Sequence, residues 1–226
     1  MSDPEANPDA NADRGRERDQ MVDRQLRSRG ISDARVLAAF REVPREAFVE
    51  PGLAAHAYDD RPLPIGEGQT ISQPFVVALM VEVLSIAPGG RVLEVGAGSG
   101  YAAAILGQLA TRVVAVERHP ALADAARARL ARLGYTNIEV HDADGMGGWP
   151  EAAPYDAILV SAAASSVPSA LVSQLAARGR LAMPVGGPHR QDLLLLAPAP
   201  DGRLTERRLG QLSFVPLTPG VARPDA

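Results

Sequence analysis

The sequence predicts an α/β protein with a Rossmann-like, doubly wound and mostly parallel sheet. Two observations lead to this prediction. Runs of β-branched residues alternate with helical segments from residue 91 onward, and a glycine-rich turn follows the first run. Such alternation implies right-handed strand–helix–strand crossovers and therefore a parallel sheet. The chain has 226 residues, 46% of them hydrophobic, which suffices for one sizeable domain.

The chain divides into a tail, an N-terminal extension and a core. Residues 1–18 contain almost no large apolar side chain and are expected to form a disordered tail. Residues 19–226 are expected to form a single domain. Its first part, 19–73, holds helices followed by a proline- and glycine-rich stretch that we interpret as an ordered, site-forming loop. Its second part, 74–226, is the Rossmann-like core.

The N-terminal extension shows apolar residues at helical spacing between residues 19 and 42, with Ser32 or Asp33 as the expected cap of a second helix. Residues 43–70 are then irregular. A buried helix is expected over 74–86, because Pro74 is tolerated in a first turn. The remaining expected elements are strands over 91–95, 112–116, 138–141, 156–160, 181–185, 193–196, 203–209 and 214–217, and helices over 101–110, 120–133 and 168–176.

Composition excludes several classes of function. A net charge of -4 and a pI near 5.6 disfavour a protein that binds nucleic acid by neutralising phosphates. The absence of cysteine excludes disulfides, zinc–thiolate sites and cysteine nucleophiles. No apolar run reaches the roughly 18 residues of a membrane span, and no signal peptide is recognisable. We therefore expect a cytoplasmic protein without a membrane partner. No metal site is expected either, since the four histidines lack ligand spacing: His56, His119, His141 and His189.

A nucleoside-binding constellation surrounds the glycine-rich turn. The run Val-Leu-Glu-Val-Gly-Ala-Gly-Ser-Gly-Tyr over 92–101 joins a buried strand to a helix start, whose free N–H groups face a ligand. Glu117 ends the next strand, where an acid accepts hydrogen bonds from ribose hydroxyls. Asp144 follows the third strand, within reach of the amino edge of adenine.

The residues around this turn favour S-adenosylmethionine over a dinucleotide. Ala103 fits the last small position of the dinucleotide pattern, so the glycines alone discriminate weakly. Glu94, however, lies at the mouth of the turn. A carboxylate there repels a pyrophosphate and suits a ligand that carries an ammonium and a sulfonium. We therefore expect S-adenosylmethionine as the methyl donor and S-adenosylhomocysteine as its product.

The residues alone leave the acceptor open. The segment Gly-Gln-Thr-Ile-Ser-Gln-Pro over 68–74 either binds a carboxylate at a helix start or merely caps that helix. A small-molecule methyltransferase, an enzyme for one dedicated peptide and a non-catalytic cofactor-binding module are alternatives. An NAD-dependent oxidoreductase would need a second catalytic constellation, and the sequence offers none.

Several stretches give the chain a family resemblance: Met21-Val22, Gln25-Leu26, Arg29–Ile31, Val43–Glu46, Phe48-Val49, Ala57-Tyr58, Pro62–Gly66, Gly68–Pro74, Val92–Tyr101, Leu133–Tyr135, Gly148–Pro150, Pro184–Gly186 and Phe214–Thr218. Together with Asp144-Gly145, they make the chain resemble the protein-L-isoaspartate (D-aspartate) O-methyltransferases over roughly residues 20–218. The departures are Ala97, where the family commonly has Thr, and Ala143, where it commonly has Gly.

The resemblance implies methyl transfer to the free carboxylate of L-isoaspartyl residues in damaged proteins or peptides, with D-aspartyl residues as a further candidate. The ester would then close to a succinimide and begin repair. Ser72 is implied as the active-site residue, and a monomer is expected. The implied cofactor-binding residues are Thr70, Ile71, Glu94, Gly96, Gly98, Ser99, Glu117, Arg118, Asp144, Gly145 and Thr218.

Overall fold

The structure, a computed structural model, describes residues 8–188, 190–199, 201 and 203–222. Its helices are α1 (Pro8–Met21), α2 (Ala34–Glu42), α3 (Pro74–Leu84), α4 (Tyr101–Leu109), α5 (Pro120–Arg132) and α6 (Ser169–Ser173). Its strands are β1 (Leu63–Gly66), β2 (Gln69–Ile71), β3 (Arg91–Val95), β4 (Arg112–Glu117), β5 (Ile138–Asp142), β6 (Tyr155–Val160), β7 (Leu175–Gly187), β8 (Arg190–Pro198) and β9 (Leu204–Leu212).

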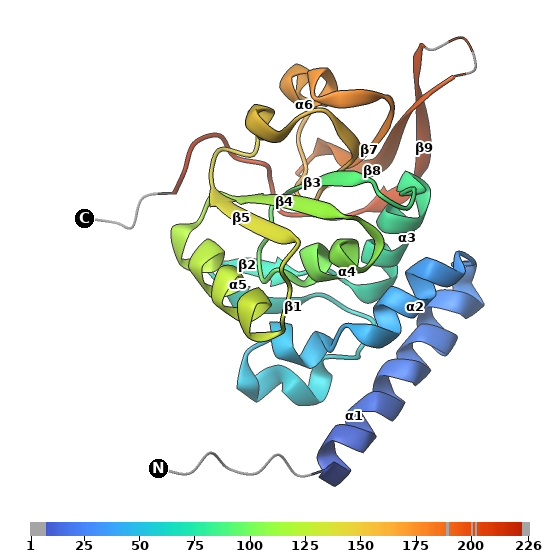
Figure 1. The fold of residues 1–226 in the computed structure, drawn as a ribbon, viewed down its shortest axis with the longest axis vertical. Coiled ribbons are helices and arrows are strands. Elements are labelled where there is room, and N and C mark those ends of the chain that lie inside the picture. Colours follow the sequence, from blue (N-terminus) through green and yellow to red (C-terminus); the bar gives the residue numbers. More distant parts are fainter. Residues whose placement is uncertain (1–7, 189, 200, 202, 223–226) are drawn as a thin grey trace.

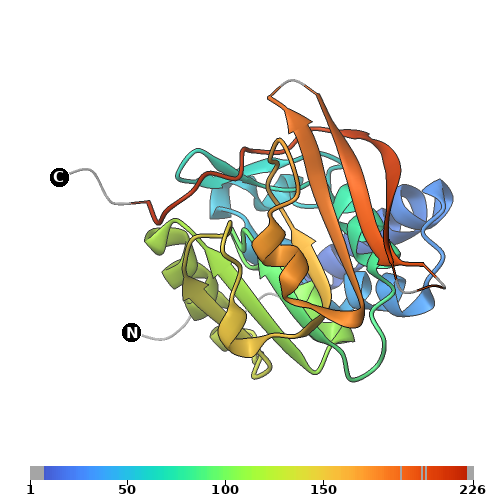
Figure 2. The ribbon, with the colours of Figure 1, turned by 90° about the horizontal axis from the view of Figure 1, so that it is seen from above.

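A seven-stranded sheet with the order β5-β4-β3-β6-β7-β8-β9 forms the centre of the molecule (Figures 1 and 2). The pairs from β5 through β7 are parallel. The pairs β7–β8 and β8–β9 are antiparallel, so the sheet ends in a three-stranded antiparallel meander. The predicted Rossmann-like, mostly parallel fold is confirmed. Strand order reverses at β3, and ligands bind at such a switch point.

Alternating side chains of β3 enter two different cores. Val92 faces the cluster formed with α3, α4 and α5, whereas Leu93 and Val95 face the opposite cluster with Leu171 of α6. Figure 1 shows the resulting layers, with α6 on one side of the sheet and α3, α4 and α5 on the other. Because both faces of these strands are buried, their sequences are nearly continuous apolar runs.

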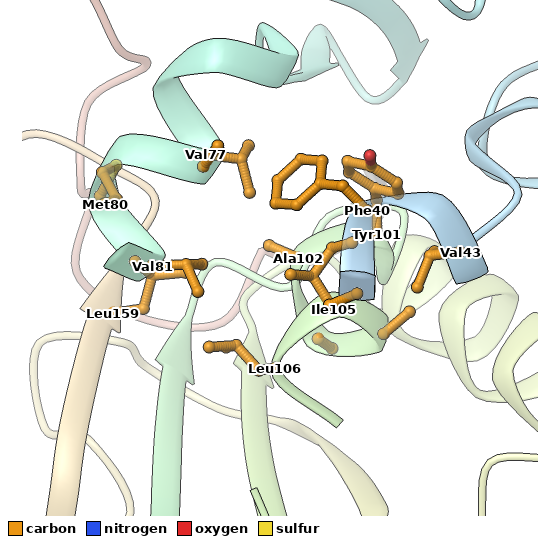
Figure 3. Close-up of a cluster of buried hydrophobic side chains, with 14 of the residues drawn as sticks. Phe40, Val43, Val77, Met80, Val81, Tyr101, Ala102, Ile105, Leu106 and Leu159 are labelled. Carbon is orange, nitrogen blue, oxygen red and sulfur yellow. The ribbon is translucent and has the colours of Figure 1, made fainter. Parts of the chain in front are cut away.

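The larger core joins the N-terminal extension to the sheet. Figure 3 shows Phe40 of α2, Val77 of α3 and Ile105 of α4 in one cluster, which also includes Leu159 of β6. Small side chains in the first turns of α4, such as Ala103, are fully buried and permit close packing. The extension is therefore part of the same hydrophobic core that supports the sheet.

The expected disordered tail is partly wrong, because α1 is helical from Pro8. Residues 1–7 lie outside the described part of the chain. The helix carries ion pairs between residues three apart, Arg14–Glu17 and Asp13–Arg16, which stabilise a helix with few apolar residues. It also ends at buried Met21, where a short π-helical turn begins, so the folded domain supports one end of it.

The segment over 43–70, which its proline and glycine content predicted to be irregular, contains short elements of regular secondary structure. Short 3-10 turns occupy Arg45–Phe48 and Pro51–His56. The antiparallel hairpin β1–β2 follows, with Glu67 at its tip in a left-handed conformation (φ 50°). Glycines on both sides of Glu67 have positive φ as well, which makes this tight reversal possible. The segment is ordered and approaches the cofactor-binding turn, as the sequence predicted.

The remaining differences concern element ends. Asp33 is the cap of α2, as predicted, since its side chain accepts hydrogen bonds from the N–H groups of Arg35 and Val36. Helix α6 is shorter than expected because β7 begins at Leu175. Residues 214–217 form only an isolated bridge, between Pro216 and Ala163. No helix in the described ranges is long and apolar enough to cross a membrane.

Candidate functional site

The glycine-rich turn after β3 is fixed by the neighbouring strand. The N–H groups of Gly96 and Ala97 both donate to the carbonyl oxygen of Val116 in β4, at 2.8 and 3.1 Å. Gly98 adopts a left-handed conformation (φ 52°), and a Cβ atom there would lie 3.1 Å from Ile65 of the β1–β2 hairpin. Glycine at this position therefore allows both the backbone turn and the close approach of the hairpin.

Glu117 is held at the end of β4 by two backbone groups. Its carboxylate accepts hydrogen bonds from Gly98 N–H at 2.8 Å and from His119 N–H at 3.0 Å. The side chain is 5% exposed. Because a carboxylate has about four acceptor positions, Glu117 keeps capacity for further donors. The carboxylate that we predicted to bind a ribose is therefore oriented by the protein itself.

Glu94 is buried and incompletely paired. Its side chain is 1% exposed, and among the residues that the structure describes, no group donates a hydrogen bond to its Oε2 atom. Burial raises the pKa of the Glu94 carboxyl well above its ordinary value, and the nearby carboxylate of Glu117 adds to the rise. A buried polar atom without a partner is costly, so Glu94 needs a donor that the described residues do not supply.

A cleft of about 910 Å³ opens over these groups, and most of the predicted site residues line it. The ones that do are Thr70, Ile71, Ser72, Glu94, Gly96, Gly98, Ser99, Glu117, Arg118, Gly145 and Thr218. They come from the ends of β2, β3 and β4 and from two loops far apart in sequence.

Asp144 follows β5, as predicted, but it is not among the residues that line this cleft. Its Oδ1 atom accepts from Met146 N–H at 2.9 Å, and its Oδ2 atom accepts from Gly220 N–H at 2.8 Å. The carboxylate therefore joins the loop after β5 to the C-terminal segment. Gly145 does approach the cleft, and a Cβ atom there would lie 2.5 Å from Val95.

A second cleft meets the first at Ser72. It has a volume of about 1460 Å³ and is lined in part by Phe75, Leu79, Leu209 and Phe214. Four residues line both clefts: Thr70, Ser72, Ser161 and Val215. Ser72 is therefore at the junction of a cleft that contains the carboxyl groups of Glu94 and Glu117 and a second groove with several large apolar side chains.

Gln191 holds the wall between the two clefts, a role that the sequence analysis missed. Its side-chain oxygen accepts from Phe214 N–H at 2.7 Å, and its nitrogen donates to the carbonyl of Phe214 at 3.2 Å. Further along, Val215 and Leu217 exchange backbone hydrogen bonds with Ala163. Gln191 is 3% exposed, but in sequence it lies between two charged residues, Arg190 and Asp192, so no local signal indicated its burial or its role.

Gln174 performs the same function for the loop after β5. It accepts from Trp149 N–H at 2.9 Å and donates to the carbonyl of Gly147 at 2.7 Å. Trp149 stacks on His141 with ring centroids 4.0 Å apart, and this contact anchors the loop. No group of three potential metal-ligating side chains occurs among the described residues.

Comparisons with known proteins agree with this geometry. A family model described as protein-L-isoaspartate (D-aspartate) O-methyltransferase matches residues 16–222. The chain belongs to this family. It is 59% identical over 213 residues to the protein-L-isoaspartate O-methyltransferase of Methylorubrum extorquens, covering 94% of this chain and 93% of that one. It is 55% identical over 202 residues to the corresponding protein of Methanoculleus marisnigri, with 89% and 91% coverage.

Solved structures of the family have the same fold. One protein-L-isoaspartate O-methyltransferase superposes with a TM-score of 0.79 at 31% identity, covering 90% of this chain and 67% of the other. A putative member from Plasmodium falciparum, crystallised with S-adenosyl-L-homocysteine, superposes with a TM-score of 0.77 at 27% identity. That comparison covers 89% of this chain and 98% of the other. The chain therefore extends over nearly the whole family fold.

We expect Glu94→Gln to raise the melting temperature of the ligand-free protein by at least about 2 °C near pH 7. Because the folded-state pKa of Glu94 is raised above its ordinary value of 4.5, the folded protein retains a proton that the unfolded chain releases. The stability from this group is fully present below the unfolded pKa and is lost as pH rises through the folded pKa. The difference between variant and parent should therefore grow as the pH rises from the unfolded-state pKa toward the raised folded-state pKa, as measured by calorimetry at a series of pH values.

Glu139→Gln is the matched control. Arg112 donates a hydrogen bond to Glu139 and lowers the pKa of its carboxyl, so this glutamate favours the folded state as pH rises. The control substitution should be neutral or destabilising over the same range, by little because the pair is exposed. Equal melting temperatures for parent and Glu94→Gln at every pH would contradict the account of Glu94.

Proposed function

We propose that this protein transfers a methyl group from S-adenosylmethionine to the free carboxylate of L-isoaspartyl residues in damaged proteins or peptides. The observation that carries the proposal is the position of Ser72 at the junction of two clefts. One cleft has the carboxylates that suit a cationic nucleoside, and the other is a groove open to a polypeptide. Membership of the family supports the same reaction.

The residues of the first cleft fit S-adenosylmethionine. The unpartnered Oε2 atom of Glu94 suits the ammonium of the methionine moiety, and Glu117 suits the ribose hydroxyls. Leu217 and Thr218 cover the cleft from the C-terminal segment. When bound, S-adenosylmethionine supplies an electrophilic methyl group attached to a sulfonium.

Ser72 is proposed to orient the acceptor carboxylate by donating a hydrogen bond. A carboxylate with an ordinary pKa near 4 is already ionised at pH 7, so the transfer needs no general base. It needs an in-line approach of oxygen to carbon, and fixing that geometry can lower the barrier by roughly 7–11 kcal/mol in favourable cases. The apolar wall from Val77, Ala102 and Leu217 excludes water, which favours two opposite charges that neutralise each other.

The proposal includes the steps that follow the transfer. The ester would close to a succinimide without help from the protein, and hydrolysis would return part of it to normal aspartate. We also include D-aspartyl residues as acceptors, a monomer as the working state and the cytoplasm as the compartment, as expected from the sequence.

The test is methyl transfer from labelled S-adenosylmethionine to two peptides that differ only in an isoaspartyl or an aspartyl linkage. We expect base-labile label on the isoaspartyl peptide alone. Cofactor binding with no label on either peptide would overturn the proposed acceptor and favour another methyl acceptor or a binding role. Failure to bind the cofactor would contradict the assignment of the first cleft.

Cofactor binding should release a proton at Glu94. Because burial raises the pKa of this carboxyl and a bound ammonium favours its ionised form, affinity should fall as the pH is lowered below the folded-state pKa. Calorimetric titration in buffers of different ionisation enthalpy measures the released protons. Glu94→Gln should abolish the release and weaken binding by about 10- to 150-fold, the value of a hydrogen bond to a charged group. Unchanged affinity in this variant would contradict the role of Glu94.

Ser72→Ala should lower kcat/KM for the isoaspartyl peptide by about 10- to 150-fold, since it removes one hydrogen bond to a charged group. Cofactor affinity should stay within about twofold, because the proposed partner of Ser72 Oγ is the acceptor and not the cofactor. Ser173→Ala provides the control, since Ser173 in α6 bonds only to its own helix, at the carbonyl of Ala170. Full turnover in Ser72→Ala would rule out the orienting role.

A further inference from the structure

Arg45 is a charged residue buried outside both clefts. It is 0% exposed and begins the 3-10 turn Arg45–Phe48 directly after Pro44. Within the described ranges, the other charged residues buried to a similar degree are Glu94 and Glu117, which line the cofactor cleft. No carboxylate among the described residues forms a salt bridge with Arg45. Arginine is rarely buried without such a partner.

The guanidinium bonds instead to two backbone carbonyls. Nε donates to the carbonyl oxygen of Ala57, and Nη2 donates to the carbonyl oxygen of Ser72, both at 2.8 Å. These carbonyls belong to segments on either side of the β1–β2 hairpin. The planar fork of arginine holds two acceptors at a fixed spacing, which a flexible ammonium does not. Arg45 therefore fixes the backbone that carries the Ser72 side chain.

The same guanidinium contacts the cofactor side of the site. Its central carbon lies 4.8 Å from the centre of the Tyr101 ring, close enough for a cation–π interaction. Tyr101 is the first residue of α4, directly after the glycine-rich turn, and it lines the cofactor cleft. The ring is held in turn by edge-on contacts with Phe40 and Phe48. One side chain thus connects the acceptor segment with the start of the cofactor-binding helix.

Stability alone does not explain this arrangement. Burial lowers the pKa of the Arg45 guanidinium, which reflects the cost of removing its charge from water. Its Nη1 atom also has no hydrogen-bond partner among the described residues. An apolar side chain of similar volume would avoid both costs. The contacts that favour a cation at this position are those with the Ser72 carbonyl and the Tyr101 ring.

We propose that Arg45 is a positioning residue for methyl transfer, which fixes Ser72 relative to the cofactor cleft through the Ser72 carbonyl and the Tyr101 ring. The inference rests on the proposed function of Ser72. A displacement of about 1 Å at a reacting centre can reduce the rate by about 100-fold, so a fixed backbone at Ser72 has a direct effect on turnover.

The test compares Arg45→Lys with Arg35→Lys in the full chain. Lysine at position 45 keeps the charge and loses the fork. Arg35 is the matched control, because it also donates to two backbone carbonyls, those of Ile86 and Leu109, at 2.7 and 2.9 Å. Neither of these carbonyls belongs to a residue that lines the two clefts. Both variants therefore remove a bridge between segments, and only one of the bridges reaches Ser72.

Each protein is assayed for melting temperature, S-adenosylmethionine affinity and steady-state kinetics with the isoaspartyl peptide. We expect Arg45→Lys to lower kcat by about 10- to 100-fold, with cofactor affinity within about twofold of the parent. Arg35→Lys should lower the melting temperature without changing kcat. Arg45→Met, which is apolar and of similar length, is the second variant and should show the same selective loss of kcat.

The outcomes separate this inference from the proposed function. An inactive parent protein would refute the proposed function itself. An active parent with unchanged kcat in Arg45→Lys and Arg45→Met would overturn the positioning role. Parallel loss of cofactor binding, melting temperature and turnover in both variants would overturn it as well, because Arg45 would then serve the fold as a whole.

Discussion

The position of β3 between β4 and β6 is the constraint on which the rest of the structure depends. β3 pairs in parallel with both neighbours, and the chain forms β4 on one side before it returns to form β6 on the other. The loops at the carboxyl ends therefore diverge and leave room for a ligand. The glycine-rich turn uses this room while its Gly96 and Ala97 N–H groups remain bound to β4. The cofactor cleft is thus a consequence of strand order, and the side chains only decide which ligand it favours.

The acceptor side depends on chain segments that the parallel sheet does not contain. The N-terminal extension supplies Ser72 through the β1–β2 hairpin, and the C-terminal segment supplies Val215 and Thr218. Both are held by side chains that bond to backbone, Arg45 on one side and Gln191 on the other. Irregular backbone needs such partners because it lacks the hydrogen bonds of a ladder. The groove therefore depends on both segments, because residues of each line it.

The sequence predicted the sheet and the cofactor cleft well because their signals are local. The composition of residues 91–95 predicts a buried strand. The turn that follows requires Gly96, Gly98 and Glu117 at a fixed spacing. Contacts between segments far apart in sequence leave no such local signal. Nothing near Asp144 in sequence indicates that its carboxylate accepts a hydrogen bond from the N–H of Gly220. Helix α1 was missed for a related reason. Its stability comes from exposed ion pairs and from its buried end at Met21, and neither produces an apolar period.

Two buried ionisable residues, one acidic and one basic, each cost the fold free energy. Glu94 and Arg45 are both removed from water, and each has an atom without a partner among the described residues. Glu94 faces the cleft, so a ligand with an ammonium supplies what it lacks. Arg45 faces backbone carbonyls and an aromatic ring, so its environment is complete except for one nitrogen. Local rules of burial are broken at both positions, and such violations are expected where a site is preorganised for a reaction. The Glu94 carboxyl lacks a partner in the free protein and therefore disfavours the folded state. A ligand that supplies this partner removes the cost.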